Sequence, residues 1–213
     1  MNQIRFNRIN KILYPLFIYF IVYQVGGNFL FLEFGEKWGR PLCLIISGLV
    51  CLVPLGLMYK ASPKLIPDKI TSAKQVVYLA LLVVAVVAIG IIINVILTQS
   101  GLVNQSKGYA KAKETLLDGS IFIQILCSVI VVPILEEILL RGIICTQVYF
   151  WHGSWMAIIT SSIFFGILHN NIVQFIYALV IGLGLGFIFI KSKRLSICIL
   201  AHSIINLVVI LLT

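Results

Sequence analysis

The chain contains 213 residues, of which 61% are hydrophobic and 11% charged, and its formal net charge is +9. This composition lies far outside that of soluble globular domains and predicts a protein that crosses the membrane several times. The Lys and Arg residues stand in short clusters between apolar runs, where membrane-topology signals lie, so we expect a membrane-lipid environment and no nucleic-acid partner.

The chain begins with Arg5, Arg8 and Lys11 ahead of an apolar stretch, which is the charge layout of a signal peptide. The stretch continues past Phe29 without a small-residue cleavage site, which favours an uncleaved first span. A membrane-spanning helix needs about 20 apolar residues. By this measure we predict about seven spans (range six to eight), at residues 12–32, 41–59, 75–98, 120–150, 154–169, 172–190 and 195–212.

Short polar segments separate these spans, and no segment forms a soluble domain. The predicted fold is therefore an all-α polytopic bundle of transmembrane helices. Residues 1–119 would contain about three N-terminal spans, and residues 120–213 would form the catalytic core from the last four.

The distribution of Lys and Arg among the connections predicts the orientation of the chain. With the N-terminus in the cytoplasm, ten of these residues face the cytoplasm: Arg5, Arg8, Lys11, Lys60, Lys64, Lys69, Lys74, Lys191, Lys193 and Arg194. Five face the other side: Lys37, Arg40, Lys107, Lys111 and Lys113. The positive-inside rule therefore favours a multi-pass protein of the cell membrane with a cytoplasmic N-terminus and, for seven spans, an external C-terminus.

The fourth and fifth predicted spans form an antiparallel hairpin that turns at residues 151–154. Glu136 precedes this turn by about as many residues as His169 follows it, so at ~1.5 Å per residue both lie roughly 24 Å from the turn and can face each other. His202 follows Arg194 by only eight residues, which corresponds to a depth of ~12 Å. For His202 to join them, either the hairpin tip projects beyond the bilayer or the helices tilt or break.

Glu136, Glu137 and Arg141 place ionisable groups inside the fourth span, where such groups are costly and usually functional. Glu137 and Arg141 are four residues apart with the acid first, the favourable order for a helical ion pair. Glu136 is turned about 100° around the helix axis, so it is left free of that pair and suits a general base for water. The alternative is that both acids pair with Arg141 and have no catalytic role.

The later spans contain two further polar patterns, Phe165-x-x-x-His169 and His202-x-x-x-Asn206. Phe165 lies one turn before His169 on the same helix face, where it shields the imidazole ring. A single histidine in such an apolar run is more often a hydrogen-bonded structural residue. His202 and Asn206 share a helix face and can both donate hydrogen bonds, a combination suited to stabilising an oxyanion.

Two histidines and a glutamate also make a plausible set of zinc ligands. The chain has no H-E-x-x-H motif, however, and its two candidate histidines come from different spans. The five cysteines form no C-x-x-C pair and lie within apolar segments, as free thiols do. We therefore favour a cofactor-free site in which Glu136 and His169 activate water directly, with a divalent metal such as zinc as the alternative.

The motifs Glu-Glu-x-x-x-Arg, Phe-x-x-x-His and His-x-x-x-Asn occur in this order on successive predicted spans. In all three motifs the chain resembles the CAAX protease and bacteriocin-processing family, also called the Abi or CPBP family, over roughly residues 120–212. The resemblance implies an intramembrane glutamic endopeptidase related to the type II CAAX prenyl proteases. By motif position, Glu136 would be the catalytic base, His169 its partner in holding water, and His202 and Asn206 the oxyanion site.

The same resemblance implies supporting roles for Glu137 and Arg141 and favours a metal-free mechanism. The expected substrate is a hydrophobic, lipidated or membrane-embedded peptide or protein, and prenylated proteins, bacteriocin leaders and signalling-peptide precursors all fit. One alternative is a non-enzymatic bacteriocin-immunity factor or regulator that binds a membrane partner protein. A transporter with an acidic relay is disfavoured because the polar groups cluster in one half of the chain.

Overall fold

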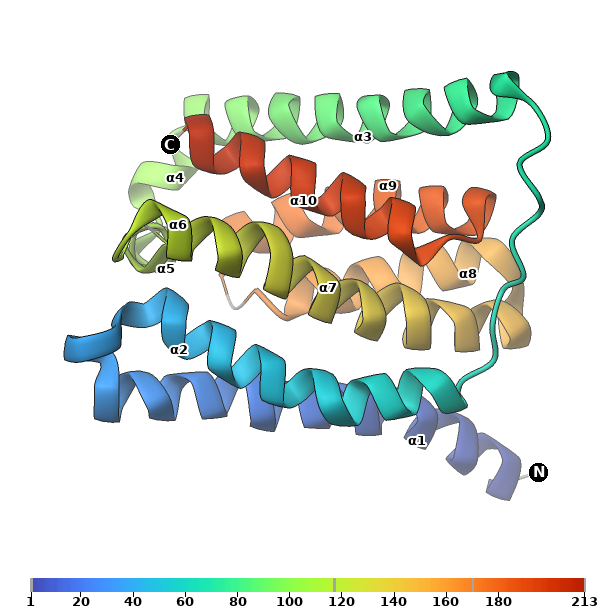
Figure 1. The fold of residues 1–213 in the computed structure, drawn as a ribbon, viewed down its shortest axis with the longest axis horizontal. Coiled ribbons are helices and arrows are strands. Elements are labelled where there is room, and N and C mark those ends of the chain that lie inside the picture. The colour runs from blue at the N-terminus through green and yellow to red at the C-terminus, as the bar shows by residue number, and fades with distance from the viewer. Residues whose placement is uncertain (1, 117, 170, 213) are drawn as a thin grey trace.

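The computed structural model describes residues 2–116, 118–169 and 171–212, and nearly all of them are helical (Figure 1). In chain order, with η for π-helical segments, the elements are α1 (Asn2–Ile18), η1 (Tyr19–Val25), α2 (Gly26–Ala61), α3 (Ala73–Gln99), α4 (Leu102–Gln105), α5 (Lys107–Leu116), α6 (Ile121–Ile125), η2 (Leu126–Val131), α7 (Val132–Glu137), η3 (Ile138–Cys145), α8 (Thr146–Ile167), α9 (Ile172–Ser192) and α10 (Leu195–Leu212). The side chains of residues 2–6, 104, 111–113, 115, 116 and 212 lie outside the description, including those of Arg5, Lys111 and Lys113 in the charge count above.

Four continuous helical stretches are long and apolar enough to cross a membrane: Asn7–Ala61, Ala73–Gln99, Ile121–Ile167 and Ile172–Ser192. A shorter apolar helix, Leu195–Leu211, follows them. Two of the four stretches reverse direction at a glycine with positive φ, Gly39 (72°) in α2 and Gly153 (80°) in α8. Residues with a Cβ rarely adopt this conformation. The described chain thus makes seven helical passes, and the predicted all-α polytopic bundle and the turn at residues 151–154 are confirmed (Figure 1).

The two ends of the chain lie at opposite ends of the bundle (Figure 1). At the end near the N-terminus, the connection between α2 and α3 is tied to the turn between α9 and α10, because Nζ of Lys193 lies 3.3 Å from the Asp68 carboxylate. At the other end, the polar connection between residues 100 and 119 contains the short helices α4 and α5.

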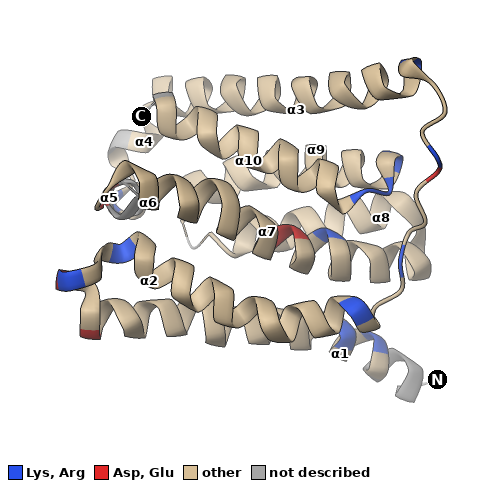
Figure 2. Ribbon diagram, viewed as in Figure 1, with Lys and Arg blue, Asp and Glu red and all other residues tan. Residues whose placement is uncertain are grey.

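Most charged residues lie toward the two ends of the bundle, and α7 and the start of η3 carry charge in its middle (Figure 2). Among the described residues, the buried carboxylates and guanidinium are those of Glu136, Glu137 and Arg141. A buried charge is costly unless it is paired and hydrogen-bonded. The surrounding helices therefore have to supply partners at this level of the bundle.

The helical hairpin of α7, η3 and α8 extends past the start of α10 (Figure 1). As a result, His202 in the second turn of α10 reaches the level of Glu136, and its Nε2 lies 3.7 Å from Oε2 of Glu136. The hairpin therefore extends beyond the start of α10 at this end of the bundle, which offsets the ~12 Å difference counted from the sequence.

Helices α8 and α9 pack closely against each other at two glycines of α9. A Cβ added at Gly182 would lie 3.0 Å from the Cα of Ser162, and one added at Gly186 would lie 3.2 Å from the side chain of Ile158. Small residues at such a contact let helix backbones approach within a membrane. This approach brings the carbonyl of Gly182 within reach of the buried charges.

Candidate active site

Glu137 and Arg141 form the ion pair that their spacing predicts, and both side chains are fully buried. Oε1 of Glu137 lies 2.9 Å from Nη1 of Arg141 and 3.0 Å from Nδ1 of His202. Nη2 of Arg141 donates to the carbonyl of Gly182, at 3.0 Å. Two charge-assisted contacts and a backbone acceptor therefore join α7, η3, α9 and α10 at one point.

Phe165 packs against Arg141 and against both histidines. Its ring centroid lies 5.0 Å from that of His169 and 5.4 Å from that of His202, both in edge-on arrangements. The guanidinium carbon of Arg141 lies 5.1 Å from the same centroid. Edge-on aromatic contacts and a cation over a ring are both favourable, so Phe165 helps to orient three polar side chains.

Glu136 points away from Arg141, as the turn around the helix predicts, but it is not free of partners. Its Oε1 accepts a hydrogen bond of 3.0 Å from the hydroxyl of Tyr19, at the start of η1. Its Oε2 lies 3.7 Å from Nε2 of His202, which is longer than a hydrogen bond. Glu136 is 6% exposed whereas Glu137 is fully buried, and Glu136 lines a cavity. Of the two carboxylates, Glu136 is therefore the one that a water molecule can reach.

His169 lies just beyond the end of α8 and is half-buried. Its Nδ1 lies 2.8 Å from the carbonyl oxygen of Phe165, which can only accept, so Nδ1 carries a hydrogen. In the neutral ring the lone pair is then on Nε2, which is available to a molecule in the cavity. The residue is thus both hydrogen-bonded to the backbone, as a structural histidine would be, and exposed to the cavity.

Asn206 lies one turn beyond His202 on α10, and its Nδ2 donates 2.8 Å to the carbonyl of Ser128 in η2. That hydrogen bond uses one of the two amide hydrogens and leaves the other for a ligand. His202 similarly uses Nδ1 on Glu137 and directs Nε2 toward Glu136. Asn206 therefore has one donor left, and Nε2 of His202 is a second donor when the ring carries a hydrogen on both nitrogens.

All four predicted catalytic residues line one small cavity. It has a volume of about 90 Å³ and is bounded by Glu136, His169, His202 and Asn206 together with apolar side chains and Tyr177. A water molecule needs roughly 10–15 Å³ of such volume, so there is room for water between the carboxylate and the imidazoles.

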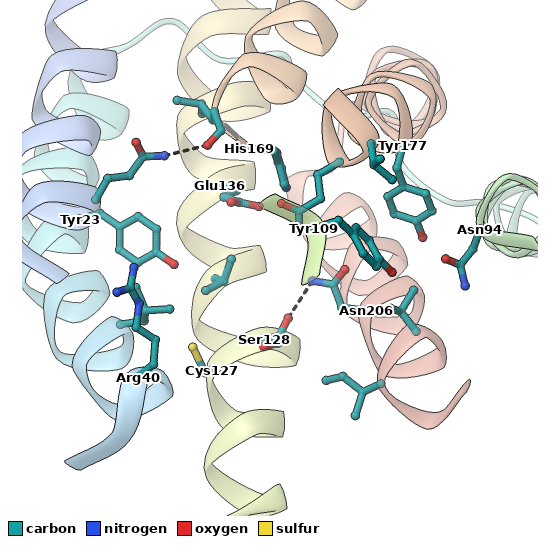
Figure 3. A pocket seen from close by; sticks show the side chains of 18 of the residues that line it. Tyr23, Arg40, Asn94, Tyr109, Cys127, Ser128, Glu136, His169, Tyr177 and Asn206 are labelled. Atoms are coloured by element: carbon teal, nitrogen blue, oxygen red, sulfur yellow. Dashed lines mark hydrogen bonds between the residues drawn. The ribbon is translucent and has the colours of Figure 1, made fainter. Parts of the chain in front are cut away.

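A larger cavity of about 400 Å³ adjoins the small one and shares Glu136, His169 and Asn206 with it. Figure 3 shows these residues between Tyr23 and Arg40 on one side and Tyr109, Tyr177 and Asn94 on the other. Ligand sites typically have volumes of ~300–1,000 Å³ with few polar groups among apolar walls. The larger cavity is therefore large enough for part of a substrate beside the small one.

Sequence reasoning missed Tyr19 as a functional residue. Tyr19 is 2% exposed and packs against Tyr23, with ring centroids 5.0 Å apart. The available signal was the pair of tyrosines four residues apart in an apolar span, but no local pattern relates this pair to Glu136, which is 117 residues away. The π-helical segments were also not predicted: η1 begins at Tyr19, and η2 and η3 flank α7. Such segments are frequent at functional sites.

The described residues contain no group of three His, Cys, Asp or Glu side chains in a metal-binding arrangement. His202 contacts both glutamates, while Nδ1 of His169 is taken by a backbone carbonyl. The preference for metal-free chemistry over a zinc site stays a prediction that a metal-depletion experiment has to decide.

Residues 118–208 match the family model described as type II CAAX prenyl endopeptidase, Rce1-like. A Bacillus subtilis (strain 168) protein named "putative membrane peptidase YdiL" is 33% identical over 90 residues, which are 42% of this chain and 37% of that protein. The match thus spans little more than a third of that relative, and no solved structure matches the chain. The matched region contains all three motifs, and the match confirms the resemblance drawn from them: residues 118–208 of this multi-pass membrane protein are similar to the Rce1-like type II CAAX prenyl endopeptidases.

Proposed function

We propose that this protein is a membrane-embedded endopeptidase that hydrolyses a peptide bond in a membrane-associated or lipidated peptide or protein. The observation that carries the proposal is the small cavity in which Glu136, His169, His202 and Asn206 surround a space large enough for water. One carboxylate, one imidazole with a free lone pair and two hydrogen-bond donors are the groups that hydrolysis by activated water requires.

In the proposed mechanism, Nε2 of His169 and Glu136 hold a water molecule, and Glu136 takes one of its protons. The water oxygen bonds to the scissile carbonyl carbon, and the carbonyl oxygen becomes an oxyanion. Hydrogen bonds from Asn206 and His202 stabilise that charge. The carbon–nitrogen bond then breaks, and the departing amine takes the proton from Glu136, which returns the site to its starting state.

The charges around His202 support its role as a donor. Two carboxylates, Glu136 and Glu137, and one guanidinium, Arg141, are buried together. The cluster is neutral when His202 carries a hydrogen on both ring nitrogens, with Nδ1–H on Glu137 and Nε2–H facing Glu136. Buried charges are tolerated when they are balanced and hydrogen-bonded. In that state Nε2–H also donates to an oxyanion in the small cavity.

The substrate class follows from the site's surroundings and its family. The larger cavity lies among apolar helices and opens onto the catalytic groups, which suits a peptide presented from the membrane rather than a folded soluble protein. The matched family model is described as a prenyl endopeptidase, and the Bacillus subtilis relative is named "putative membrane peptidase YdiL". A prenylated peptide is therefore the first substrate to test.

The decisive experiment compares purified Glu136→Gln protein with wild type and with Glu33→Gln as a matched control. Glu33 is exposed on α2, so its substitution removes a carboxylate without touching the cavities. With a farnesylated peptide in detergent and mass spectrometry of the products, Glu136→Gln should lower kcat by at least about 10²-fold, a typical contribution of general-base catalysis. Cleavage by Glu136→Gln at the wild-type rate would contradict the mechanism.

Two further arms address the remaining alternatives. Activity should survive exhaustive treatment with a chelator; loss of activity that added zinc restores would instead indicate a metal-dependent site. In cells, Glu136→Gln and His169→Ala proteins should accumulate in the membrane without supporting the physiological process. Full complementation by both variants would favour the binding role of an immunity factor or regulator.

A further inference from the structure

The larger cavity contains a cationic side chain that the proposed hydrolysis does not use. Arg40 follows the Gly39 turn in α2, and its side chain lines the cavity that also holds Glu136 and His169. Among the described residues that line this cavity, Arg40 carries the one guanidinium or ammonium group. Figure 3 shows it beside Tyr23, displaced from Glu136 toward Cys127.

The guanidinium of Arg40 is held in place but lacks an anion. Nη2 donates to the side-chain carbonyl of Asn28, and the group lies over the ring of Phe31, 4.9 Å from the centroid. Nε is buried and has no hydrogen-bond partner among the described residues. The Asp118 carboxylate accepts a hydrogen bond of 2.6 Å from the backbone N–H of Arg40 and does not pair with its guanidinium. Within the described part of the chain, no carboxylate lies within 4.0 Å of that guanidinium.

From these contacts we infer that Arg40 binds a carboxylate of the substrate while the scissile bond lies at Glu136. The inference rests on the proposed function for its substrate and deepens it. A planar guanidinium presents paired N–H groups that match the two oxygens of a carboxylate. Asn28 and Phe31 already contact the Arg40 guanidinium, so binding a carboxylate costs less side-chain entropy than it would for an uncontacted side chain.

The dimensions of the cavity limit where in the substrate that carboxylate lies. The cavity follows the helix from Glu136 to Ser128, eight residues or ~12 Å along the axis, and Figure 3 shows Arg40 near the level of Ser128 and Cys127. An extended peptide advances roughly 3.3 Å per residue. A carboxylate on Arg40 is therefore within about four residues of the scissile bond, and it belongs either to the C-terminus of the peptide or to an Asp or Glu side chain at that distance.

Binding to the full-length protein tests the inference without requiring turnover. The probes are a farnesylated cysteine followed by three apolar residues, prepared as the free acid, as the carboxamide, and as the carboxamide with Glu as the last residue. Their affinities are measured in detergent for Glu136→Gln protein and for the same protein with Arg40→Gln, Arg40→Lys or Lys37→Gln. Lys37 is exposed and three residues from Arg40, so it controls for loss of positive charge at this end of the bundle.

We expect the free acid to bind at least about tenfold more tightly than the carboxamide, and Arg40→Gln to abolish that ratio while Lys37→Gln preserves it. Arg40→Lys should keep part of the ratio, because charge remains but the paired N–H groups are lost. Tight binding of the Glu-containing carboxamide assigns the carboxylate to a side chain, and weak binding assigns it to the C-terminus.

Equal weakening of acid and carboxamide by Arg40→Gln would overturn the inference, as would an acid-to-amide ratio near one in the parent protein. The inference would also be overturned if Arg40→Gln changed only the preference of the protein for phosphatidylglycerol vesicles over phosphatidylcholine vesicles. Arg40 would then contact a lipid headgroup. If Arg40→Gln does not fold, the acid-to-carboxamide affinity ratios of the parent and Arg40→Lys proteins test the inference instead. An Arg40-dependent ratio without any cleavage by wild type would establish Arg40 as a carboxylate-binding residue and count against the proposed function.

Discussion

Replacing Tyr19 by Phe removes one oxygen atom and isolates the contact between the first helical pass and the candidate base. The Tyr19 hydroxyl donates 3.0 Å to Oε1 of Glu136, and the ring itself is 2% exposed. Phe keeps the ring packing but leaves Oε1 without its donor. Hydrogen bonds to charged groups contribute about 1.5–3 kcal/mol, and ~1.4 kcal/mol corresponds to a factor of ten in rate. If that energy holds Glu136 in its reactive position, kcat should fall roughly tenfold to a hundredfold.

The assay is steady-state cleavage of the farnesylated peptide, with kcat and KM determined separately. Because Tyr19 acts on the carboxylate, we expect the loss in kcat and little change in KM. Tyr23→Phe is the matched control, since Tyr23 packs against Tyr19 and lines the same cavity, yet the structure gives it no hydrogen bond to Glu136. A folded Tyr19→Phe protein with wild-type kcat, or an equal loss in Tyr23→Phe, would refute the positioning role.

Two further predictions concern stability, measured as the apparent Tm in detergent. Arg141→Met removes one cation from a buried cluster that holds two carboxylates, so it should destabilise the protein by about 3–5 kcal/mol. Adding Glu137→Gln should restore much of this loss. An unchanged Tm for Arg141→Met would show that the pair does not hold the helices together. Gly182→Ala should lower the Tm because its Cβ would lie 3.0 Å from the Cα of Ser162, whereas Gly56→Ala, with nothing within 4 Å, should leave it unchanged or raise stability by about 0.5–1 kcal/mol. Equal effects at the two glycines would contradict the close-packing argument.

The architecture was largely predictable because the membrane constrains both the length and the polarity of each pass. Charged and glycine-containing segments marked the turns, and the turn at residues 151–154 follows from Gly153. The prediction ended the first span at residue 32, but the helix continues to the Gly39 turn, because a helix can extend past the apolar segment into the polar interface. The helices α4 and α5 were missed since their polar sequence resembles a connection.

The site was predictable where its contacts are local and obscure where they are not. Four-residue spacing correctly predicted the pair of Glu137 and Arg141, because residues one helical turn apart lie side by side. Two contacts from distant passes have no comparable signal: the Tyr19 hydroxyl that donates to Glu136, and the Gly182 carbonyl that accepts from Arg141. Packing of whole helices determines those contacts, and hydrophobic periodicity does not encode which backbone atom faces which side chain. The catalytic roles of Glu136 and His169 remain predictions.

The first three passes contribute to the site although the family match begins only at residue 118. Tyr19 supplies the donor on Glu136, and Arg40 and Asn94 line opposite sides of the larger cavity (Figure 3). Residues from the matched region thus surround the water-sized space, while residues that precede it shape the adjoining cavity. Changes in the N-terminal passes can therefore alter which peptides bind without altering the groups proposed to hydrolyse them. The division at residue 119 stays a prediction, and the hydrogen bond from Tyr19 to Glu136 is a contact that crosses it.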